Sequence, residues 1–383
     1  MRIALITHDI VKTDGQGRVN YELAHYLSQQ GHNIHLYANR VDQSLLDAPH
    51  VSVHHIPVLD LTNLIKGVSF ALIVCLVLRR NKFDIIHNNG DAAFAASDVN
   101  TCHFCHSSAP REMTLQRSFS KSLYLKLYRE FHAFMERFAY RRSRMVIAVS
   151  RQIAKELVTT TGTSLHKIAV VYNGVDSDEY EPRSLRPAPH EEKEKVKELR
   201  LLFVGDLSST RKGLDTILEA LRHLPEYVTL SVVGRTANST YPQVVAANPM
   251  LRQRVHFWGF RSDMPAIYRA HDLFIFPSHY DPFGLVVLEA MSAGLAVIVS
   301  AHAGASELIE HLVNGYILQD PNDAATLAEY VKRLHDDEPS RDRLCEQARK
   351  DAVLQSWQQM ARQIELVYER IHSDRNATSA VSQ

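Results

Sequence analysis

The sequence predicts an α/β protein with two Rossmann-like domains, each built on a parallel sheet. Short apolar runs alternate with helical stretches along most of the 383 residues, which is typical of parallel sheets covered by helices on both faces. A chain of this length is long for a single hydrophobic core. The segment 181–198 is rich in Pro, Glu and Lys, lacks a core pattern and separates the apolar runs into two sets.

The apolar runs give the expected strands in chain order. Those of the first domain are Arg2–Thr7, Ile34–Ala38, Ile85–His87, Met145–Val149 and Ile168–Tyr172. Those of the second domain are Arg200–Val204, Thr229–Val233, Val255–Trp258, Leu273–Phe276 and Ala296–Ser300. After Asp323 the pattern is entirely helical. We therefore predict domains at 1–180 and 199–353, a linker at 181–198, a final helix at 354–372 and a disordered tail at 373–383.

Composition excludes several classes of protein. Lys+Arg and Asp+Glu number 43 each, so no overall charge indicates a nucleic-acid partner. The first residues form a strand pattern without a signal-peptide cleavage site, and the four cysteines are expected to be free thiols in a reducing cytoplasm. The apolar run Phe70–Leu78 is too short to span a bilayer.

The segment from Phe274 to Ser300 is the most informative part of the chain. It reads as an apolar strand, a Pro-containing loop, a helix and a second apolar strand, which together make one βαβ unit. Asp281 precedes the helix and Glu289 lies within it. The N–H groups at the helix start, near Gly284, Leu285 and Val286, could hold a phosphate without a charged side chain.

This segment resembles the acidic signature of the family 4 glycosyltransferases, retaining enzymes that take a sugar from a nucleotide-linked donor. The family signature is an acidic residue, then Phe-Gly, then a Glu eight positions after the first; Asp281 stands where the family usually has Glu. The resemblance implies the GT-B architecture, in which a C-terminal helix crosses back to the first domain. It also implies that Asp281 orients the donor sugar and that Glu289 holds the ribose hydroxyls.

Two loops are candidates for binding the donor diphosphate. Gly15 and Gly17 precede a helix expected from about Val19 to Gln30, and a glycine-rich turn lets a phosphate approach the backbone. Arg211 and Lys212 lie in the loop after the first strand of the second domain, where a cation could neutralise the leaving diphosphate. By resemblance, Lys212 is the family's phosphate-contacting lysine. Many members have an Arg where this chain has Asp206, and Arg211 could supply that charge.

A second group of candidates would contact the sugar and the base. His103 ends a run that resembles the family strand ending in Thr-x-His at the cleft, so the resemblance makes it the catalytic-site contact. His106 is a near competitor, and His87 is not expected to take part. The loop containing Phe260 and Arg261 is expected to border the base.

Other motifs have alternative interpretations. The run Cys102-His103-Phe104-Cys105-His106 matches a haem-attachment pattern and could be part of a metal cluster, but no second ligand pair accompanies it. The Asp-Ser-Asp at 176–178 resembles a metal-nucleotide motif, although its position predicts a polar turn. We expect no metal and no cofactor.

The segment 111–155 is basic and amphipathic, with eleven Lys and Arg against three Glu. It fits a helix lying on an anionic membrane surface and equally a packed helix with a solvated basic face.

The function predicted is metal-independent sugar transfer, with retention, from a nucleotide sugar to a hydroxyl of a glycan, a lipid-linked molecule or a small molecule. UDP-sugar is the expected donor. The alternatives are a nucleotide-sugar epimerase or sugar phosphorylase of the same fold, and a non-catalytic nucleotide-sugar-binding subunit.

Overall fold

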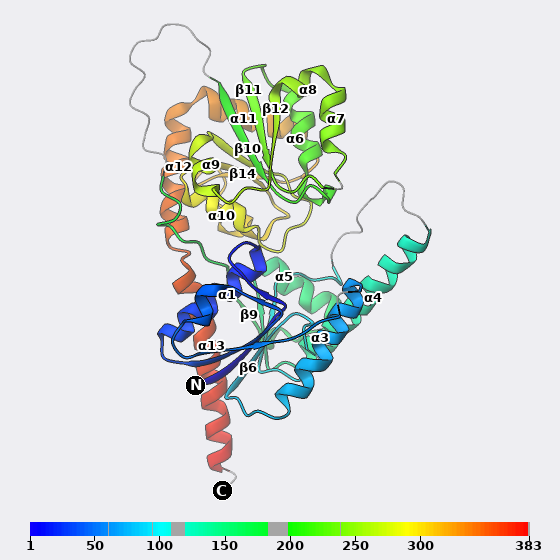
Figure 1. Ribbon diagram of the computed structural model, residues 1–383. Helices are drawn as coiled ribbons and strands as arrows, with labels where there is room; N and C mark the ends of the chain where they lie inside the picture. Colours follow the sequence, from blue (N-terminus) through cyan, green and yellow to red (C-terminus); the bar gives the residue numbers. More distant parts are fainter. Residues whose placement is uncertain (60, 94, 109–118, 183–197, 238, 382–383) are drawn as a thin grey trace. The chain divides into compact units, whose positions relative to one another are not determined.

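The computed structural model describes the chain except for residues 60, 94, 109–118, 183–197, 238 and 382–383 (Figure 1). It divides into two compact units. Unit 1 takes the described part of residues 1–174 together with the helix that begins at Trp357, and unit 2 takes Val175–Ser356. Most of the predicted linker 181–198 lies outside the described residues.

Unit 1 is built on a seven-stranded parallel sheet in the order β5-β3-β1-β6-β7-β8-β9. Its strands are β1 (Arg2–Ile6), β3 (Asn33–Ala38), β5 (Val51–His55), β6 (Ile85–Asn89), β7 (Val99–Cys102), β8 (Met145–Ala148) and β9 (Ile168–Val170), and a small separate pair joins β2 (Asp9–Ile10) to β4 (Arg40–Val41). Strand order reverses between β1 and β6, and ligands of such sheets bind beyond the carboxyl ends of the strands at this reversal.

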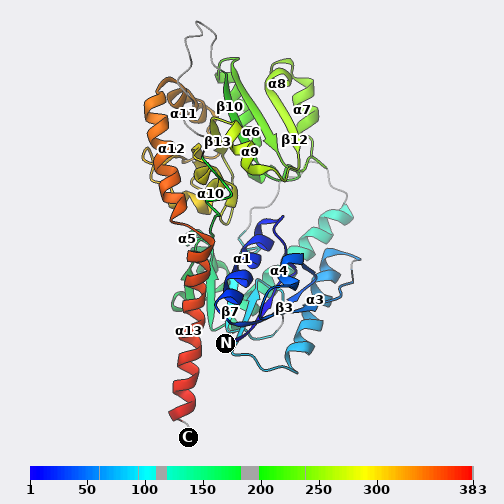
Figure 2. The same cartoon turned by 60° about the vertical axis from the view of Figure 1, so that its left-hand side comes forward.

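The helices of unit 1 flank this sheet. They are α1 (Gly15–Gln29), α2 (Gln43–Leu46), α3 (Asn63–Leu78), α4 (Phe119–Arg142), α5 (Arg151–Glu156), a π-helical turn (Leu157–Thr161), a 3-10 turn (Leu165–Lys167) and α13 (Trp357–Val381). Helix α13 packs beside α1, as both views show (Figures 1 and 2). The apolar side chains along one face of α13, among them Trp357, Met360 and Ile364, are buried. The predicted return of the last helix to the first domain is therefore confirmed.

The C-terminal prediction needs a correction, because residues 373–381 are helical and not a disordered tail. Polar residues in this stretch suggested disorder, but tertiary contacts fix the helix. Arg375 donates to the backbone oxygen of Asp84 and to the buried carboxylate of Asp98. A buried charge needs such a partner, and the pair therefore holds the extra turns of helix against unit 1.

Unit 2 is built on a six-stranded parallel sheet in the order β12-β11-β10-β13-β14-β15. Its strands are β10 (Leu199–Val204), β11 (Val228–Val233), β12 (Val255–Gly259), β13 (Leu273–Phe276), β14 (Ala296–Ser300) and β15 (Tyr316–Leu318). The apolar runs of the sequence become strands that are buried on both faces, as β13 and β14 are throughout. Here strand order reverses between β10 and β13.

The helices of unit 2 follow its strands in sequence. They are η3 (Thr210–Lys212), α6 (Leu214–Ala220), η4 (Leu221–His223), α7 (Tyr241–Ala247), α8 (Pro249–Arg254), α9 (Met264–Ala270), α10 (Leu285–Ser292), η5 (Gly304–Leu308), α11 (Ala324–Asp336) and α12 (Glu338–Val353). Helix α8 packs on β11 and β12, whereas α11 and α12 pack on β14. The prediction of two parallel-sheet α/β domains is thus confirmed.

Candidate functional site

The predicted donor-binding residues of unit 2 gather where strand order reverses. Lys212 follows β10 and Asp281 follows β13, and these two strands are neighbours in the sheet. The carboxyl ends of parallel strands meet at one edge, so both residues reach the same place. The Lys212 ammonium forms an ion pair with Oδ2 of Asp281, and their side chains are only 17% and 11% exposed.

The loop that carries Lys212 is bound to the segment that carries Asp281. The backbone oxygen of Arg211 accepts from the N–H of His279 at 2.8 Å and from Oγ of Ser278 at 3.1 Å. The Arg211 guanidinium lies 6.0 Å from the ring centre of Tyr280. This network fixes the cationic loop over the end of β13.

Gly213 makes the close approach of these two segments possible. Its φ of +77° lies in the left-handed region, and a Cβ there would lie 2.0 Å from the backbone oxygen of Pro277. Only glycine fits both conditions. The backbone therefore requires glycine after Lys212.

Helix α10 starts beside this pair without a side-chain cap. Gly284 occupies the cap position with φ of +91°, and the helix begins at Leu285 and Val286. Its first N–H groups stand at the positive end of the helix dipole, where an anion is stabilised. The predicted Gly284, Leu285 and Val286 thus lie close in sequence and space to Asp281.

Glu289 and the predicted base-binding loop are held by local contacts. Oε2 of Glu289 accepts from the hydroxyl of Tyr268 at 2.8 Å, and Tyr268 is fully buried. Burial raises the pKa of Tyr268, so this hydroxyl stays a donor. Phe260 is 56% exposed on the loop after β12, and Arg261 pairs there with Asp263 at 2.6 Å.

Asp206, which stands where many family members have Arg, caps a turn. Its Oδ1 accepts from the N–H of Ser208 at 3.0 Å. Asp176 likewise accepts from the N–H of Asp178 at 3.0 Å, so the Asp-Ser-Asp motif forms the predicted polar turn. Among the described residues no group of three or more His, Cys, Asp or Glu could hold a metal ion.

Unit 1 has a cavity of about 300 Å³ beyond the carboxyl ends of β1, β6 and β7, at its own reversal of strand order. The residues that line it are mostly polar: His8, Gln16, Lys66, Gly67, Asn89, Gly90, Asp91, His103, Phe104, His106, Tyr128, His132 and Glu136. Both predicted competitors, His103 and His106, face this cavity. Sequence analysis missed its other polar members because they come from four separate segments.

His103 is held neutral at this cavity. Its Nε2 lies 2.9 Å from Oδ1 of Asn89, and burial lowers its pKa to about 4. His106 differs, because both its backbone N–H and its Nδ1 lie 2.8 Å from Oε1 of Glu136. Burial lowers the pKa of His106, but the bond to Glu136 and that residue's charge outweigh burial and raise it.

A second carboxylate–imidazole pair faces the same cavity. Asp91 bonds to Nδ1 of His132, which is 8% exposed, and the pKa of Asp91 is lowered because this bond outweighs burial. The opposite nitrogen of His132, Nε2, has no partner among the described residues. The ring of His106 stacks on the imidazole with its centre 4.9 Å away, and the tilted ring of Tyr128 has its centre 4.2 Å away.

Gly15, Gly17 and His87, which the sequence analysis also discussed, lie in unit 1. Gly15 and Gly17 do not form a loop before the helix, because α1 already begins at Gly15 and Asp14 caps it through the N–H of Gly17. A Cβ on Gly17 would lie 2.8 Å from Asp14. His87 is buried and bonded to Tyr368 and Thr101, so it holds α13 to the sheet, as expected of a residue outside the site.

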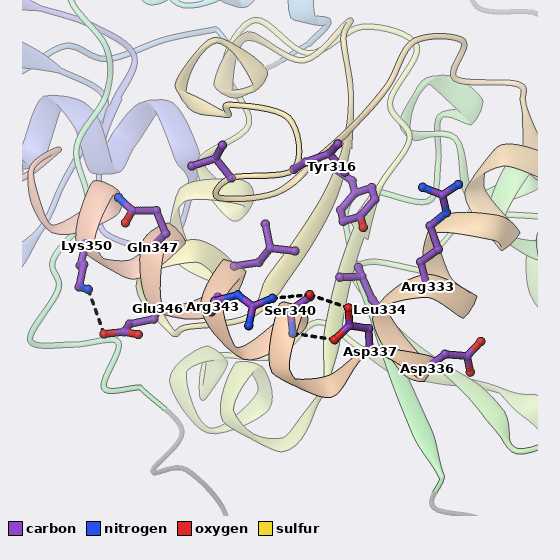
Figure 3. Close-up of a pocket in the computed structure, with 13 residues that line it drawn as sticks. Tyr316, Arg333, Leu334, Asp336, Asp337, Ser340, Arg343, Glu346, Gln347 and Lys350 are labelled. Carbon is purple, nitrogen blue, oxygen red and sulfur yellow. Dashed lines mark hydrogen bonds and ion pairs between the residues drawn. The ribbon is translucent and has the colours of Figure 1, made fainter.

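A second cavity, in unit 2, does not contain the predicted residues. It measures about 850 Å³ and lies between α11, α12 and the segment before β15 (Figure 3). Its polar residues are largely engaged with one another, as Ser340 is with Asp337 and Lys350 with Glu346. It lies on a different part of unit 2 from the reversal between β10 and β13.

Known protein families match both units. A model described as Glycosyltransferase Family 4 matches residues 13–179, and one described as Glycosyl transferases group 1 matches residues 186–351. The chain belongs to the family 4 glycosyltransferases. An uncharacterised glycosyltransferase of Methanocaldococcus jannaschii is 29% identical over 306 residues, which is 76% of each chain.

Solved structures show that this glycosyltransferase has the GT-B fold. WaaG, a glycosyltransferase involved in lipopolysaccharide biosynthesis, superposes with a TM-score of 0.73 at 21% identity, over 94% of this chain and 98% of WaaG. The HepE protein of Anabaena, solved in complex with UDP-glucose, gives 0.70 at 21% identity, over 97% of this chain and 100% of HepE. At this identity the likeness establishes the fold alone.

The basic segment 111–155 of the glycosyltransferase contains α4, and residues 111–118 lie outside the described ones. Met135 and Tyr140 are buried in unit 1, whereas Leu127 and Phe134 are 58% and 64% exposed. One face of α4 is therefore packed, and the contact with a membrane stays a prediction. Among the helices of the described residues none is long and apolar enough to cross a bilayer.

Proposed function

We propose that the protein is a retaining glycosyltransferase that uses a UDP-sugar and transfers the sugar to a hydroxyl of a glycan or lipid-linked acceptor. The observation that carries this proposal is the meeting of Lys212 and Asp281 at the strand reversal of unit 2, beside the uncapped start of α10. A cation and a helix start at one place suit the diphosphate of a nucleotide sugar.

Several predicted residues of unit 2 take a role at this donor site. Lys212, with Arg211, and the N–H groups of α10 stabilise the charge that grows on the leaving diphosphate. This arrangement needs no metal ion. Glu289, oriented by Tyr268, holds the ribose hydroxyls, and Phe260 borders the base.

The acceptor binds to unit 1 at the cavity beyond β1, β6 and β7. Its lining offers both donors and acceptors to sugar hydroxyls, with neutral His103 as the contact closest to the chemistry. By resemblance to the family, the acceptor hydroxyl attacks the face that the diphosphate leaves, and the diphosphate takes the proton. WaaG is involved in lipopolysaccharide biosynthesis and HepE was solved in complex with UDP-glucose, so an envelope glycan and a UDP-sugar are the first acceptor and donor to test.

Calorimetry with UDP-, GDP- and ADP-sugars tests the proposal, with and without a divalent metal. We expect one UDP-sugar to bind without metal and the Glu289→Ala variant to lose this binding. Glu219→Ala is the matched control, because Glu219 is an exposed glutamate of α6 in the same unit. No binding of any nucleotide sugar would reject the proposal, and turnover of a donor without an acceptor would indicate an epimerase.

A further inference from the structure

We infer that Asp281 is a positioning residue, which holds the Lys212 ammonium in place for the donor diphosphate and does not contact the donor sugar. The inference rests on the proposed function, and it changes the role that the family resemblance gives to this position. It is carried by the contacts of the Asp281 carboxylate, by the turn that Asp281 closes and by the surroundings of Lys212.

Both carboxylate oxygens of Asp281 are already engaged within unit 2. Oδ2 forms the ion pair with Lys212, and Oδ1 accepts from the N–H of Phe283 at 3.1 Å. The residue is 8% exposed. The lone pairs that remain on the two oxygens are therefore largely shielded, and a ligand that pulled the carboxylate away would have to break a charge-assisted bond and a buried backbone bond.

The backbone of Asp281 is equally fixed. Its N–H donates to the backbone oxygen of His302 at 3.1 Å, and its own oxygen accepts from the N–H of Gly304 at 2.9 Å. These two bonds pair Asp281 with Ala303 as a short parallel bridge. The backbone that carries the carboxylate is therefore held in place, and the carboxylate can move toward a ligand only by rotation of the side chain, which would break its own two bonds.

The short side chain at this position is required by the turn. The bond from the N–H of Phe283 to Oδ1 of Asp281 closes a ring over two residues, which Asp and Asn form and a longer Glu does not form with the same geometry. The shorter Asp281, at the position where the family usually has Glu, therefore suits a carboxylate that closes this turn and positions Lys212. The carboxylate is tied to its own loop and reaches Lys212.

Lys212 gains a defined position from this contact. A lysine ammonium sits on a flexible four-carbon stem, and fixing it costs conformational entropy. Asp281 on one side and the ring of Phe276, whose centre lies 5.3 Å from Nζ, on the other restrict that freedom before a donor arrives. A preorganised cation stabilises a developing negative charge more effectively than a mobile one.

The test compares UDP alone with UDP-glucose. We expect Asp281→Asn and Asp281→Glu to weaken the binding of UDP alone by about tenfold, because the Lys212 ammonium is no longer held where it meets the diphosphate. Lys212→Met should weaken it similarly, and Asp281→Asn should add little to Lys212→Met, because both changes disrupt one unit. Asp336→Asn, an exposed aspartate of α11, is the control.

Two results would overturn the inference. One is unchanged binding of UDP alone in Asp281→Asn together with loss of sugar transfer, which would make Asp281 a sugar contact. The other is full activity of Asp281→Glu, since a Glu cannot keep both the turn and the ion pair. Thermal unfolding of each variant shows whether it folds.

A measurement without any nucleotide separates this inference from the proposed function. Acetylation of the folded protein by an acylating reagent, followed by mass spectrometry, reports how strongly the Lys212 amine is held. We expect the reagent to acetylate Lys212 several times faster in the Asp281→Asn variant than in the wild type. If wild type binds no nucleotide, the proposed function fails; if acetylation is also unchanged in Asp281→Asn, the positioning role fails independently.

Discussion

Asn89 sets the tautomer of His103. The amide nitrogen of Asn89 donates to the backbone oxygen of Ile6 at 3.0 Å, so its amide oxygen faces Nε2 of His103 at 2.9 Å. That ring nitrogen must then carry the hydrogen, and Nδ1 is left as a lone-pair acceptor. Strands β1 and β6 thus orient the catalytic candidate through one side chain.

Replacement of Asn89 by Ala should slow sugar transfer about fivefold, since one orienting hydrogen bond is worth about 1 kcal/mol and the ring loses its fixed tautomer. Affinity for the donor nucleotide should change little. Measurement of the transfer rate at varied concentrations of the acceptor checks this prediction. Asn81→Ala is the control, because Asn81 also makes one bond to a backbone oxygen in unit 1 but lies outside the cavity. Equal loss in both variants would contradict the prediction.

The free energy of unfolding should fall as the pH drops from about 6.5 toward 4. Burial lowers the pKa of His103 to about 4 and that of His87 to about 3. In this window the unfolded chain binds protons at these residues and the folded protein does not, so acid favours unfolding. Urea denaturation at pH 7, 6 and 5 measures the effect. His87→Gln should show a shallower dependence on pH; an unchanged slope would count against this assignment.

Gly213→Ala should abolish donor binding and lower the stability of unit 2. Gly31→Ala is a matched comparison, because Gly31 has nearly the same φ, +76°, and no atom within 4 Å of an added Cβ. The left-handed conformation alone costs about 1 kcal/mol, whereas at Gly213 the clash with Pro277 is added to it. Thermal unfolding and calorimetry of both variants measure the difference, and similar losses would refute the steric argument.

Tyr268→Phe should weaken nucleotide binding about fivefold to tenfold while the protein stays folded. The change removes the hydroxyl that orients Glu289 and leaves the buried ring in place. Titration with UDP checks the affinity, and titration with inorganic pyrophosphate is the control because that ligand lacks ribose. Weaker binding of both UDP and pyrophosphate would show that removal of the Tyr268 hydroxyl perturbs the structure of unit 2 as a whole.

Glu136→Gln should destabilise unit 1 by about 3 kcal/mol, since a buried carboxylate that accepts charge-assisted bonds loses its charge. The 1% exposed carboxylate accepts from His106 and from both the N–H and the hydroxyl of Ser107. Without it the pKa of His106 should fall. Chemical denaturation and NMR titration of the imidazole measure the two effects, and an unchanged His106 titration would contradict the pairing.

The sequence predicted the sheets well because their signal is local. Apolar runs such as those of β13 and β14 are continuous in the chain and are buried on both faces. The short strand β5 was missed, since Val51–His55 alternates with exposed polar residues and lies at the sheet edge. Helix α13 was ended too early because the anchor of Arg375 on Asp98 joins residues 277 positions apart.

Sequence analysis identified those residues of the candidate site that belong to a motif within one continuous segment. Lys212, Asp281 and His103 were named from such motifs, and the structure places the first two in contact. The orienting partners Asn89 and Tyr268 carried no local signal, because strand pairing and helix packing bring them to His103 and Glu289. Partners that depend on topology can be found only after the order of the strands is known.

The helix that returns to unit 1 imposes an order on synthesis. The residues of unit 2, Val175–Ser356, come off the ribosome as one continuous stretch and can fold as they emerge. Unit 1 must wait, because Tyr368 and Glu365, which bond to His87 and His32, are made only after unit 2. A nascent chain stalled before Trp357 would leave the α1 surface bare, so the domain that begins at residue 1 is completed only after all of unit 2 has been made.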